Sequence, residues 1–307
     1  MKSPTFEVGK EEEKIERLTE LVRDREDFPA LLPIMRKQGA TGILQPSDYD
    51  DALKYREQLP KFLTSESLEG SAVEIFDEII FDFDGVLYDG MYAVNRAVLG
   101  MIETMADKTI PLPKTIEDIA TSFQSPFQKY YRRFGIFLET PEEITSFRDA
   151  YREVQTKVNA EHHTPATLFP EVKAVLDAMK AAKRVNPNLK IHIISAGSAK
   201  HIQEVLTQHG VIGDFDQIHA ECHDKVAMIQ FIAERAPKKE RVVMVGDLPS
   251  DIKDGQKVNG VRTLAVARTP ESREWLGMYL PDYIVSDLSG MFHLQSYAKE
   301  LQNQLQP

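Results

Sequence analysis

The stretch "IIFDFDGVLYD", residues 79–89, decides the fold class of this chain. The apolar run 79–81 predicts a buried strand, and Asp82, Asp84 and Gly85 follow it directly. If the strand continues through these residues, its period of two points both carboxylates to the same side. An apolar strand that ends in two like charges aimed at one spot needs a chemical explanation.

The composition is that of an ordinary globular protein, with 42% hydrophobic and 28% charged residues in 307. This length suits about two domains. A formal net charge of -11 opposes nonspecific binding to nucleic acid or to an anionic membrane. Cys222 is the only cysteine, so an internal disulfide is excluded. The N-terminal residues are too charged for a signal peptide, and no apolar run is long enough to span a bilayer. We therefore predict a cytoplasmic protein.

Short apolar runs alternate with helical patterns from residue 79 onward. Such alternation predicts an α/β fold with a doubly wound, Rossmann-like parallel sheet covered on both faces. Gly210 follows one helical pattern where a C-terminal cap favours glycine. The expected strands are "IIFDFD" (79–84), "KIHIIS" (190–195), "FDQIHA" (215–220), "RVVMVGD" (241–247), "VRTLAV" (261–266) and "YIV" (283–285).

About 100 residues separate the first two expected strands, which is far more than one crossover needs, and most of them have helical patterns. An inserted helical domain explains this interval. Within it, "KYYRRF" (129–134) is interpreted as a solvated helix face, with a contact to a substrate's leaving group as the alternative. The predicted division is a helical extension at 1–72, a core at 73–90 and 168–292, an inserted helical domain at 91–167 and a C-terminal tail at 293–307. The extension is expected to dock on the main body; self-association or a contact with another protein is the alternative.

Polar residues end several of the expected strands. Asp82 and Asp84 end the first, Ser195 the second, and Asp247 the fourth, with Asp251 four residues later. Ligands bind at the carboxyl ends of the strands in such sheets. Two carboxylates about 5 Å apart at an effective dielectric of about 20 repel by roughly 3 kcal/mol, so a cation is expected among them. A site that has few carboxylates and leaves room for water and phosphate suits Mg²⁺ better than Ca²⁺.

Four motifs in this order resemble those of the haloacid dehalogenase superfamily. The apolar strand with Asp-x-Asp-Gly is "IIFDFDGVLYD", the strand ending in Ser is "IHIISAG", the third motif is Lys225, and the fourth is "VGDLPSD". The resemblance covers residues 75 to about 290 and makes the insertion similar to that family's helical C1 cap. Relatives that cleave carbon–halogen bonds lack the second Asp, because halide leaves without a proton. Asp84 therefore favours phosphate chemistry.

The resemblance implies a role for each matching residue. Asp82 would be the nucleophile that forms an aspartyl-phosphate, and Asp84 would be the general acid and base. Mg²⁺ would be held by Asp82, by Asp84 through its backbone carbonyl, and by Asp247, with support from Asp251. Ser195 and Lys225 would bind the oxygens of the substrate phosphate.

These expectations describe a Mg²⁺-dependent, metal-binding hydrolase: a phosphoric monoester phosphatase that acts on a small phosphorylated metabolite, without nucleic-acid or membrane partners. Two alternatives stay open. A phosphomutase of the same family would use the same residues, whereas a noncatalytic ligand-binding or regulatory protein would use the pocket only as a sensor.

Overall fold

The structure is a computed structural model that describes residues 68–115, 118–119, 127–161, 167–222 and 224–304, together with residues 58, 61 and 62. Nearly all of the predicted N-terminal extension, residues 1–72, lies outside the described residues, so that extension stays a prediction. Within the described ranges, every helix is too short or too polar to cross a bilayer.

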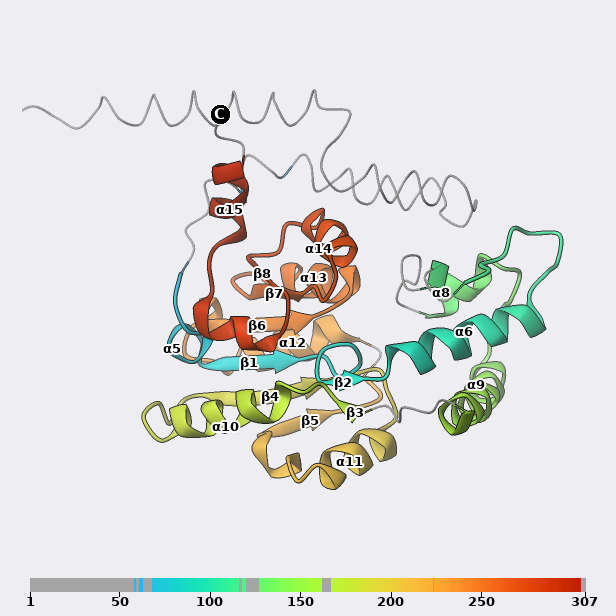
Figure 1. Ribbon diagram of the computed structural model, residues 1–307, viewed down its shortest axis with the longest axis horizontal. Helices are drawn as coiled ribbons and strands as arrows, with labels where there is room; N and C mark the ends of the chain where they lie inside the picture. The colour runs from blue at the N-terminus through green and yellow to red at the C-terminus, as the bar shows by residue number, and fades with distance from the viewer. Residues whose placement is uncertain are drawn as a thin grey trace, which may run out of the picture.

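The core is a six-stranded sheet with strand order β5-β4-β1-β6-β7-β8, and every neighbouring pair is parallel (Figure 1). The expected strands are all present, and apart from the end of the first, their bounds agree with the structure within two residues. The strands are β1 (Glu78–Phe81), β4 (Lys190–Ile194), β5 (Gln217–His219), β6 (Val242–Gly246), β7 (Arg262–Val266) and β8 (Tyr283–Val285).

The first strand is shorter than predicted. It ends at Phe81 and does not continue to Asp84. The Asp82 N–H still donates to Val245 O of β6 at 2.9 Å, but the chain then turns, and the N–H groups of Leu87 and Tyr88 both donate to Phe83 O. The two aspartates are therefore placed by a turn at the strand end, and the alternation of a pleated strand does not position them.

Helices cover both faces of the sheet. Ile79 and Phe81 pack in one hydrophobic cluster with α10 (Val172–Lys183) and α11 (Ala199–Gln208), whereas Ile80 packs in another with α12 (Lys225–Ala233). Successive residues of β1 thus face different helical layers, which confirms the doubly wound α/β core. Further elements of this part are α5 (Ala72–Ile75), η1 (Ile212–Asp214), η2 (Lys239–Arg241), α13 (Pro249–Gln256), α14 (Pro270–Gly277), η3 (Leu288–His293) and α15 (Tyr297–Gln304).

The C-terminus of α11 has the cap that its sequence predicts. Gly210 has a φ of +69°, in the left-handed region that favours glycine, and nothing lies within 4 Å of where a Cβ would be. The Val211 N–H donates to Leu206 O at 2.9 Å, and both of these side chains are buried. This is a Schellman cap, in which a bond of this kind satisfies a carbonyl that the helix itself leaves unpaired.

The inserted segment forms a hydrophobic cluster of its own. The helices α6 (Met91–Met105), α8 (Phe127–Arg132) and α9 (Pro141–Glu161) lie together beside the core (Figure 1). Two short strands, β2 (Tyr88–Asp89) and β3 (Thr167–Leu168), pair antiparallel where the chain leaves the core and where it returns. The exact division into a core and a cap remains a prediction, since these contacts describe packing alone.

The interpretation of "KYYRRF" as a solvated face is wrong for its aromatic residues. Tyr130, Tyr131 and Phe134 are at most 2% exposed and pack against one another in the cluster of the inserted segment. Arg132 between them is exposed and pairs with Glu139 at 3.0 Å. The aromatic rings are buried because this short helix packs against α9, which the local sequence does not reveal.

The stretch predicted as a C-terminal tail contains α15, which packs on the core. Ala298 is buried, the Arg273 guanidinium of α14 lies 2.6 Å from a Glu300 oxygen, and Lys299 pairs with Glu69 at 3.0 Å. Contacts with α14 and with Glu69, which precedes α5, hold this helix.

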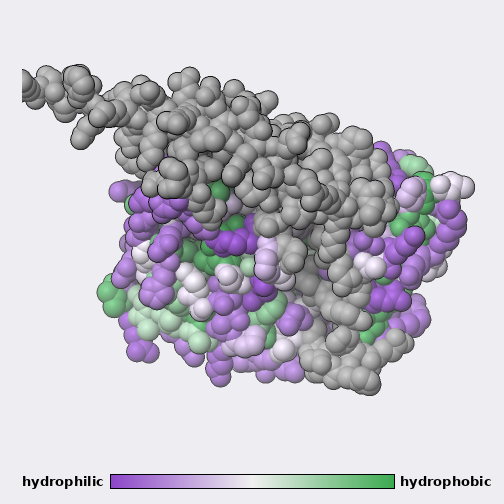
Figure 2. All heavy atoms as spheres, turned by 45° about the horizontal axis from the view of Figure 1, so that its top comes forward, coloured by the Kyte–Doolittle hydropathy of each residue, from purple (hydrophilic) through white to green (hydrophobic). Residues whose placement is uncertain are grey.

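Hydrophilic and hydrophobic residues are interspersed over the coloured part of the face in Figure 2. The large exposed hydrophobic side chains of the described residues come from separate segments, and singly exposed hydrophobic residues are normal on soluble proteins. They are Leu68, Met105, Phe137, Val185, Ile212 and Phe231.

Candidate active site

The predicted site residues lie at the carboxyl ends of three adjacent strands. Asp82 follows β1, Ser195 follows β4 and Asp247 follows β6, and β1 lies between the other two strands. Asp251 is in the first turn of α13, and Lys225 is the first residue of α12. Residues from distant parts of the sequence therefore meet at one edge of the sheet, where open α/β sheets bind ligands.

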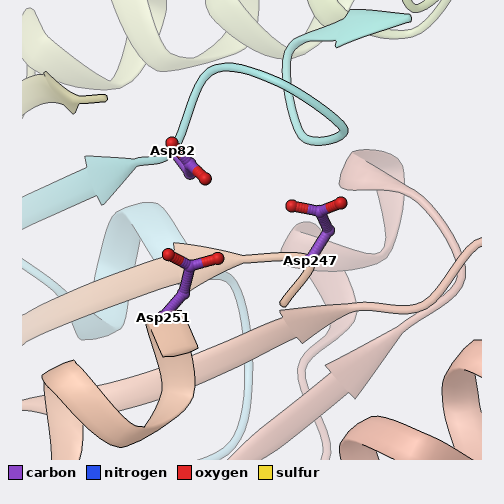
Figure 3. A group of neighbouring side chains, drawn as sticks. All are labelled: Asp82, Asp247 and Asp251. Carbon is purple, nitrogen blue, oxygen red and sulfur yellow. The ribbon is translucent and has the colours of Figure 1, made fainter. Parts of the chain in front are cut away.

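Three carboxylates converge there, and we call them the acidic cluster: Asp82, Asp247 and Asp251. Each offers an oxygen that lies within 4.8 Å of the oxygens of the other two. Their carboxylates surround a common space in Figure 3. The side chain of Asp84 is not part of this cluster, and the use of its backbone carbonyl as a metal ligand stays a prediction.

The ammonium of Lys225 joins two members of the acidic cluster. Its Nζ lies 3.0 Å from Asp82 Oδ2 and 2.7 Å from Asp251 Oδ1, and its side chain is only 14% exposed. Burial lowers the pKa of Lys225, but the charges of Asp251 and Asp82 outweigh burial and raise the pKa well above its usual range. The lysine is therefore a fixed positive charge beside Asp82.

One lysine does not neutralise the carboxylates around it. Burial, followed by repulsion from Asp251 and Asp84, raises the pKa of Asp82 from 3.8 to about 7, against the opposing effect of Lys225. Burial and repulsion from Asp251 and Asp82 also raise the pKa of Asp247 well above its usual range. Without another cation, these carboxyls hold protons that a free aspartate would have lost.

The residues present fit a hard divalent cation. Asp247 Oδ1 is buried without a hydrogen-bond partner in the structure, which leaves it available to a metal. The oxygens of Asp251 are both engaged, because Oδ1 accepts from Lys225 and Oδ2 accepts from the Leu248 N–H at 3.2 Å. Both oxygens of Asp82 also have partners, the Phe83 N–H and Lys225, so Asp247 Oδ1 is the buried oxygen of the acidic cluster that is left without one. A set of oxygen donors of this kind suits Mg²⁺.

Gly85 allows the loop after β1 to approach Asp247 closely. Its φ is +78°, and a Cβ at this position would lie 2.0 Å from Asp247 Oδ2. A larger residue would thus be strained in its backbone and would also displace the carboxylate. The glycine of the first motif is therefore required by both the backbone and the site.

Ser195 and Asp84 lie beside the acidic cluster, on either side of Gly197. The position that a Gly197 Cβ would take is 3.1 Å from Ser195 Oγ and 3.3 Å from Asp84 Oδ2. The Gly197 N–H donates to Ser195 Oγ at 2.9 Å, so the hydroxyl proton of Ser195 stays available for an anion. Burial raises the pKa of Asp84, whereas His201 and Lys225 act in the opposite direction.

Three aromatic residues lie around Asp84, and none of them belongs to the predicted site. His201 packs edge-on against the rings of Phe83 and Tyr88, and its Nε2 is buried without a partner. Burial, and then the charge of Asp84, raise the pKa of Tyr88 to about 12 and raise that of Tyr151, from α9. The inserted segment thus brings a phenol near Asp84, and no motif could have predicted it.

Comparison with known proteins places this site in a family. The model of the family described as haloacid dehalogenase-like hydrolase matches residues 79–266, which is more than half of the chain. A curated relative, pyrophosphatase PpaX from Oceanobacillus iheyensis, is 27% identical over 201 residues, covering 58% of this chain and 90% of the relative. Pyrophosphatase PpaX from Bacillus cereus is 25% identical over 225 residues, covering 71% of this chain and 95% of the relative.

Solved structures share the fold. A haloacid dehalogenase-like hydrolase from Bacteroides fragilis superposes with a TM-score of 0.55 at 21% identity, covering 70% of this chain and 99% of that one. A predicted phosphoglycolate phosphatase from Haemophilus somnus superposes with a TM-score of 0.52 at 18% identity, covering 70% of this chain and 96% of that one. With the family match, the doubly wound sheet and the convergence of the four motifs at one sheet edge, the chain belongs to the haloacid dehalogenase-like hydrolase family.

Proposed function

We propose that this hydrolase is a Mg²⁺-dependent phosphatase that acts on a small phosphorylated metabolite through an aspartyl-phosphate on Asp82. The observation that carries the proposal is the meeting of Asp82, Lys225, Asp247 and Asp251 at one point, with a single ammonium among three carboxylates. An anionic phosphoryl group reaches such a site only if its charge and that of the carboxylates are both compensated.

In the first step, an oxygen of Asp82 attacks phosphorus and the bond to the leaving oxygen breaks. Asp82 Oδ1 accepts a hydrogen bond from the Phe83 N–H at 2.8 Å, and Oδ2 contacts Lys225, so the carboxylate is held in one orientation. Asp84 donates its proton to the leaving oxygen, and burial favours the protonated form that this requires. Lys225 and Ser195 hold nonbridging oxygens of the phosphoryl group.

In the second step, water attacks the aspartyl-phosphate. Asp84, which lost its proton in the first step, now accepts one from the water, and the phosphorus–oxygen bond to Asp82 breaks. Inorganic phosphate leaves, Asp82 returns as a carboxylate and Asp84 is protonated again. A nucleophilic side chain thus divides one difficult displacement into two easier ones.

Asp82, Asp247 and the Asp84 carbonyl would hold the Mg²⁺ ion, with Asp251 behind them. When bound, this ion supplies positive charge that lowers the repulsion between the carboxylates and the phosphoryl group.

The names of the relatives guide the choice of substrates. Pyrophosphatase PpaX proteins are the curated relatives described above, so inorganic pyrophosphate belongs beside phosphomonoesters on the first panel. The inserted helices lie beside the core, near the carboxyl end of β1 (Figure 1), where they can cover a small substrate.

Phosphate release from pyrophosphate, phosphoglycolate and several sugar phosphates, with Mg²⁺ and with EDTA, tests the proposal. We expect release that depends on Mg²⁺, and a hydroxamate after quenching with hydroxylamine, which reacts with an acyl phosphate. Interconversion of sugar phosphate isomers without phosphate release would instead indicate the phosphomutase. Binding of a phosphorylated compound without turnover would indicate the noncatalytic alternative.

Removal of Mg²⁺ is expected to make stability depend on pH. Because burial raises the pKa of Asp82 from 3.8 to about 7, the metal-free folded protein binds more protons than the unfolded chain between these values. Its stability therefore falls as the pH rises from about 4 to about 7, where the contribution of Asp82 is lost. The raised pKa of Asp247 acts in the same direction. Thermal melting in EDTA from pH 5 to pH 8 measures this loss.

Mg²⁺ should reverse the loss, because an ion that binds only the folded state stabilises it by mass action. We expect the increase in melting temperature on adding Mg²⁺ to be larger at pH 8 than at pH 5. An increase that is equal at the two pH values would show that the acidic cluster does not bind the ion.

The predicted cytoplasmic location and the role of residues 1–72 are not addressed by these experiments and stay predictions.

A further inference from the structure

We propose that Arg268 is a positioning residue that holds the loop carrying Asp84 in its catalytic place and ties that loop to the chain returning from the inserted segment. This inference rests on the proposed phosphatase function and adds a residue that none of the four motifs contains. The residue follows β7, two strands away from β1 in the sheet.

All three nitrogens of the Arg268 guanidinium have partners. Nε donates to Gly85 O at 3.2 Å, Nη2 donates to Val86 O at 2.9 Å, and Nη1 lies 2.9 Å from Glu171 Oε1. The guanidinium carbon also lies 3.3 Å from the centroid of the Phe169 ring. Only arginine combines a planar fork of donors with a face that stacks on an aromatic ring.

The loop needs these donors because its own backbone hydrogen bonds leave the carbonyls of Gly85 and Val86 without a donor. Phe83 O accepts from the N–H groups of Leu87 and Tyr88, and Tyr88 O accepts from the Gly85 N–H. Gly85 and Val86 are buried, and the bonds that the structure gives their carbonyls come from Arg268. Buried carbonyls without a donor are costly, so the loop would rearrange if the guanidinium were removed.

A rearrangement of this loop would move catalytic groups. Asp84 directly precedes Gly85, and Gly85 lies against the Asp247 carboxylate. On the other side, Arg268 contacts Phe169 and Glu171, which follow β3, and the Phe169 N–H donates to Leu87 O at 3.0 Å. One side chain therefore fixes the loop before β2 and the segment after β3, where the chain passes to and from the inserted helices.

The test compares Arg268→Met with Arg241→Met. Arg241 is a matched control, because its guanidinium also has three polar contacts, two hydrogen bonds to Asp77 and one to Glu74 O, against two hydrogen bonds and an ion pair for Arg268. Its side chain is 30% exposed, against 23% for Arg268. It precedes β6, at the opposite end of the sheet from the site. Both variants lose a partly buried guanidinium, but only one of them should affect catalysis.

For Arg268→Met we expect kcat on an alkyl phosphate to fall by about 100-fold, as a small misplacement of catalytic groups can cause, with a much smaller change in KM. The loss should be far smaller on p-nitrophenyl phosphate, whose leaving group departs without needing a proton from Asp84. Asp84→Asn should show the same dependence on the leaving group. Arg241→Met should lower the melting temperature and leave kcat unchanged on both substrates.

Arg268→Lys keeps the positive charge but loses the fork and the stacking, so its kcat should fall between those of the wild type and Arg268→Met. If Arg268→Met does not fold, the same kcat comparison is made with Arg268→Lys. Arg268 does not position Asp84 if kcat falls equally on the two substrates or no further than in Arg241→Met. A wild-type protein that releases no phosphate would overturn the proposed function instead, so the two failures are distinguishable.

Discussion

Replacing Asp82 by Asn is expected to reduce phosphate release by at least about 10³-fold, because the proposed nucleophile is lost. The amide is nearly isosteric and can still accept a hydrogen bond from Lys225, so the fold should be kept. In EDTA at pH 8, the variant should melt at a higher temperature than the wild type. It has one negative charge fewer in the acidic cluster, where repulsion and burial raise the pKa of Asp82. Initial rates on the best substrate of the panel, with melting curves, measure both effects.

The control for this substitution is Asp254→Asn, which removes the same charge from the same domain. Asp254 lies on α13 and pairs with Lys257 at 2.8 Å, outside the acidic cluster. We expect the Asp254→Asn variant to release phosphate at the wild-type rate. Asp82→Asn should also give no hydroxamate after the hydroxylamine quench. Undiminished turnover in this variant would rule out the covalent mechanism, whatever the substrate.

Replacing Gly85 by Ala should damage both stability and activity. A non-glycine residue at a φ of +78° costs about 1–2 kcal/mol. The new Cβ would also lie 2.0 Å from Asp247 Oδ2, so the carboxylate or the loop must move. We expect a loss of at least about 1–3 kcal/mol in the free energy of unfolding and a fall in kcat of about 100-fold. Chemical denaturation and initial rates measure the two losses separately.

The Gly210→Ala variant measures the cost of a side chain at a positive φ without a steric clash with a neighbouring residue. Gly210 has a similar φ of +69°, but nothing lies within 4 Å of its Cβ position. This variant should lose about 1–2 kcal/mol of stability and keep its full kcat. If Gly85→Ala retains wild-type kcat while its stability falls as in Gly210→Ala, the close approach to Asp247 has no catalytic importance.

Much of the core was predictable because its signals are local. Apolar runs that alternate with helical patterns predicted the six strands of the sheet, and Gly210 predicted the end of α11. The site residues Asp82, Ser195 and Asp247 were predictable because parallel strands bring their carboxyl ends to one edge. The convergence of Lys225 on Asp82 and Asp251 agrees with the motif order. Their catalytic roles stay predictions until turnover is measured.

Two other features were not predicted, one in a local turn and one in the packing of the inserted segment. The β1 strand stops at Phe81 because a turn of six residues closes on Phe83 O. Tyr130 and Tyr131 are buried because α8 packs inside the inserted segment, whereas a mixed basic and aromatic sequence is also compatible with a solvated face.

Local patterns in the sequence predict which carboxylates, which hydroxyl and which ammonium meet at the edge of a parallel sheet. How these groups are held follows only from the packing of distant elements. Arg268 donates hydrogen bonds to Gly85 and Val86, more than 180 residues away along the chain. The two oxygens of Asp251 accept hydrogen bonds from Lys225 and from the Leu248 N–H. Periodicity reports which face a residue occupies within its own element. Pairing between distant side chains is set by how whole elements pack, and that information is distributed over the chain.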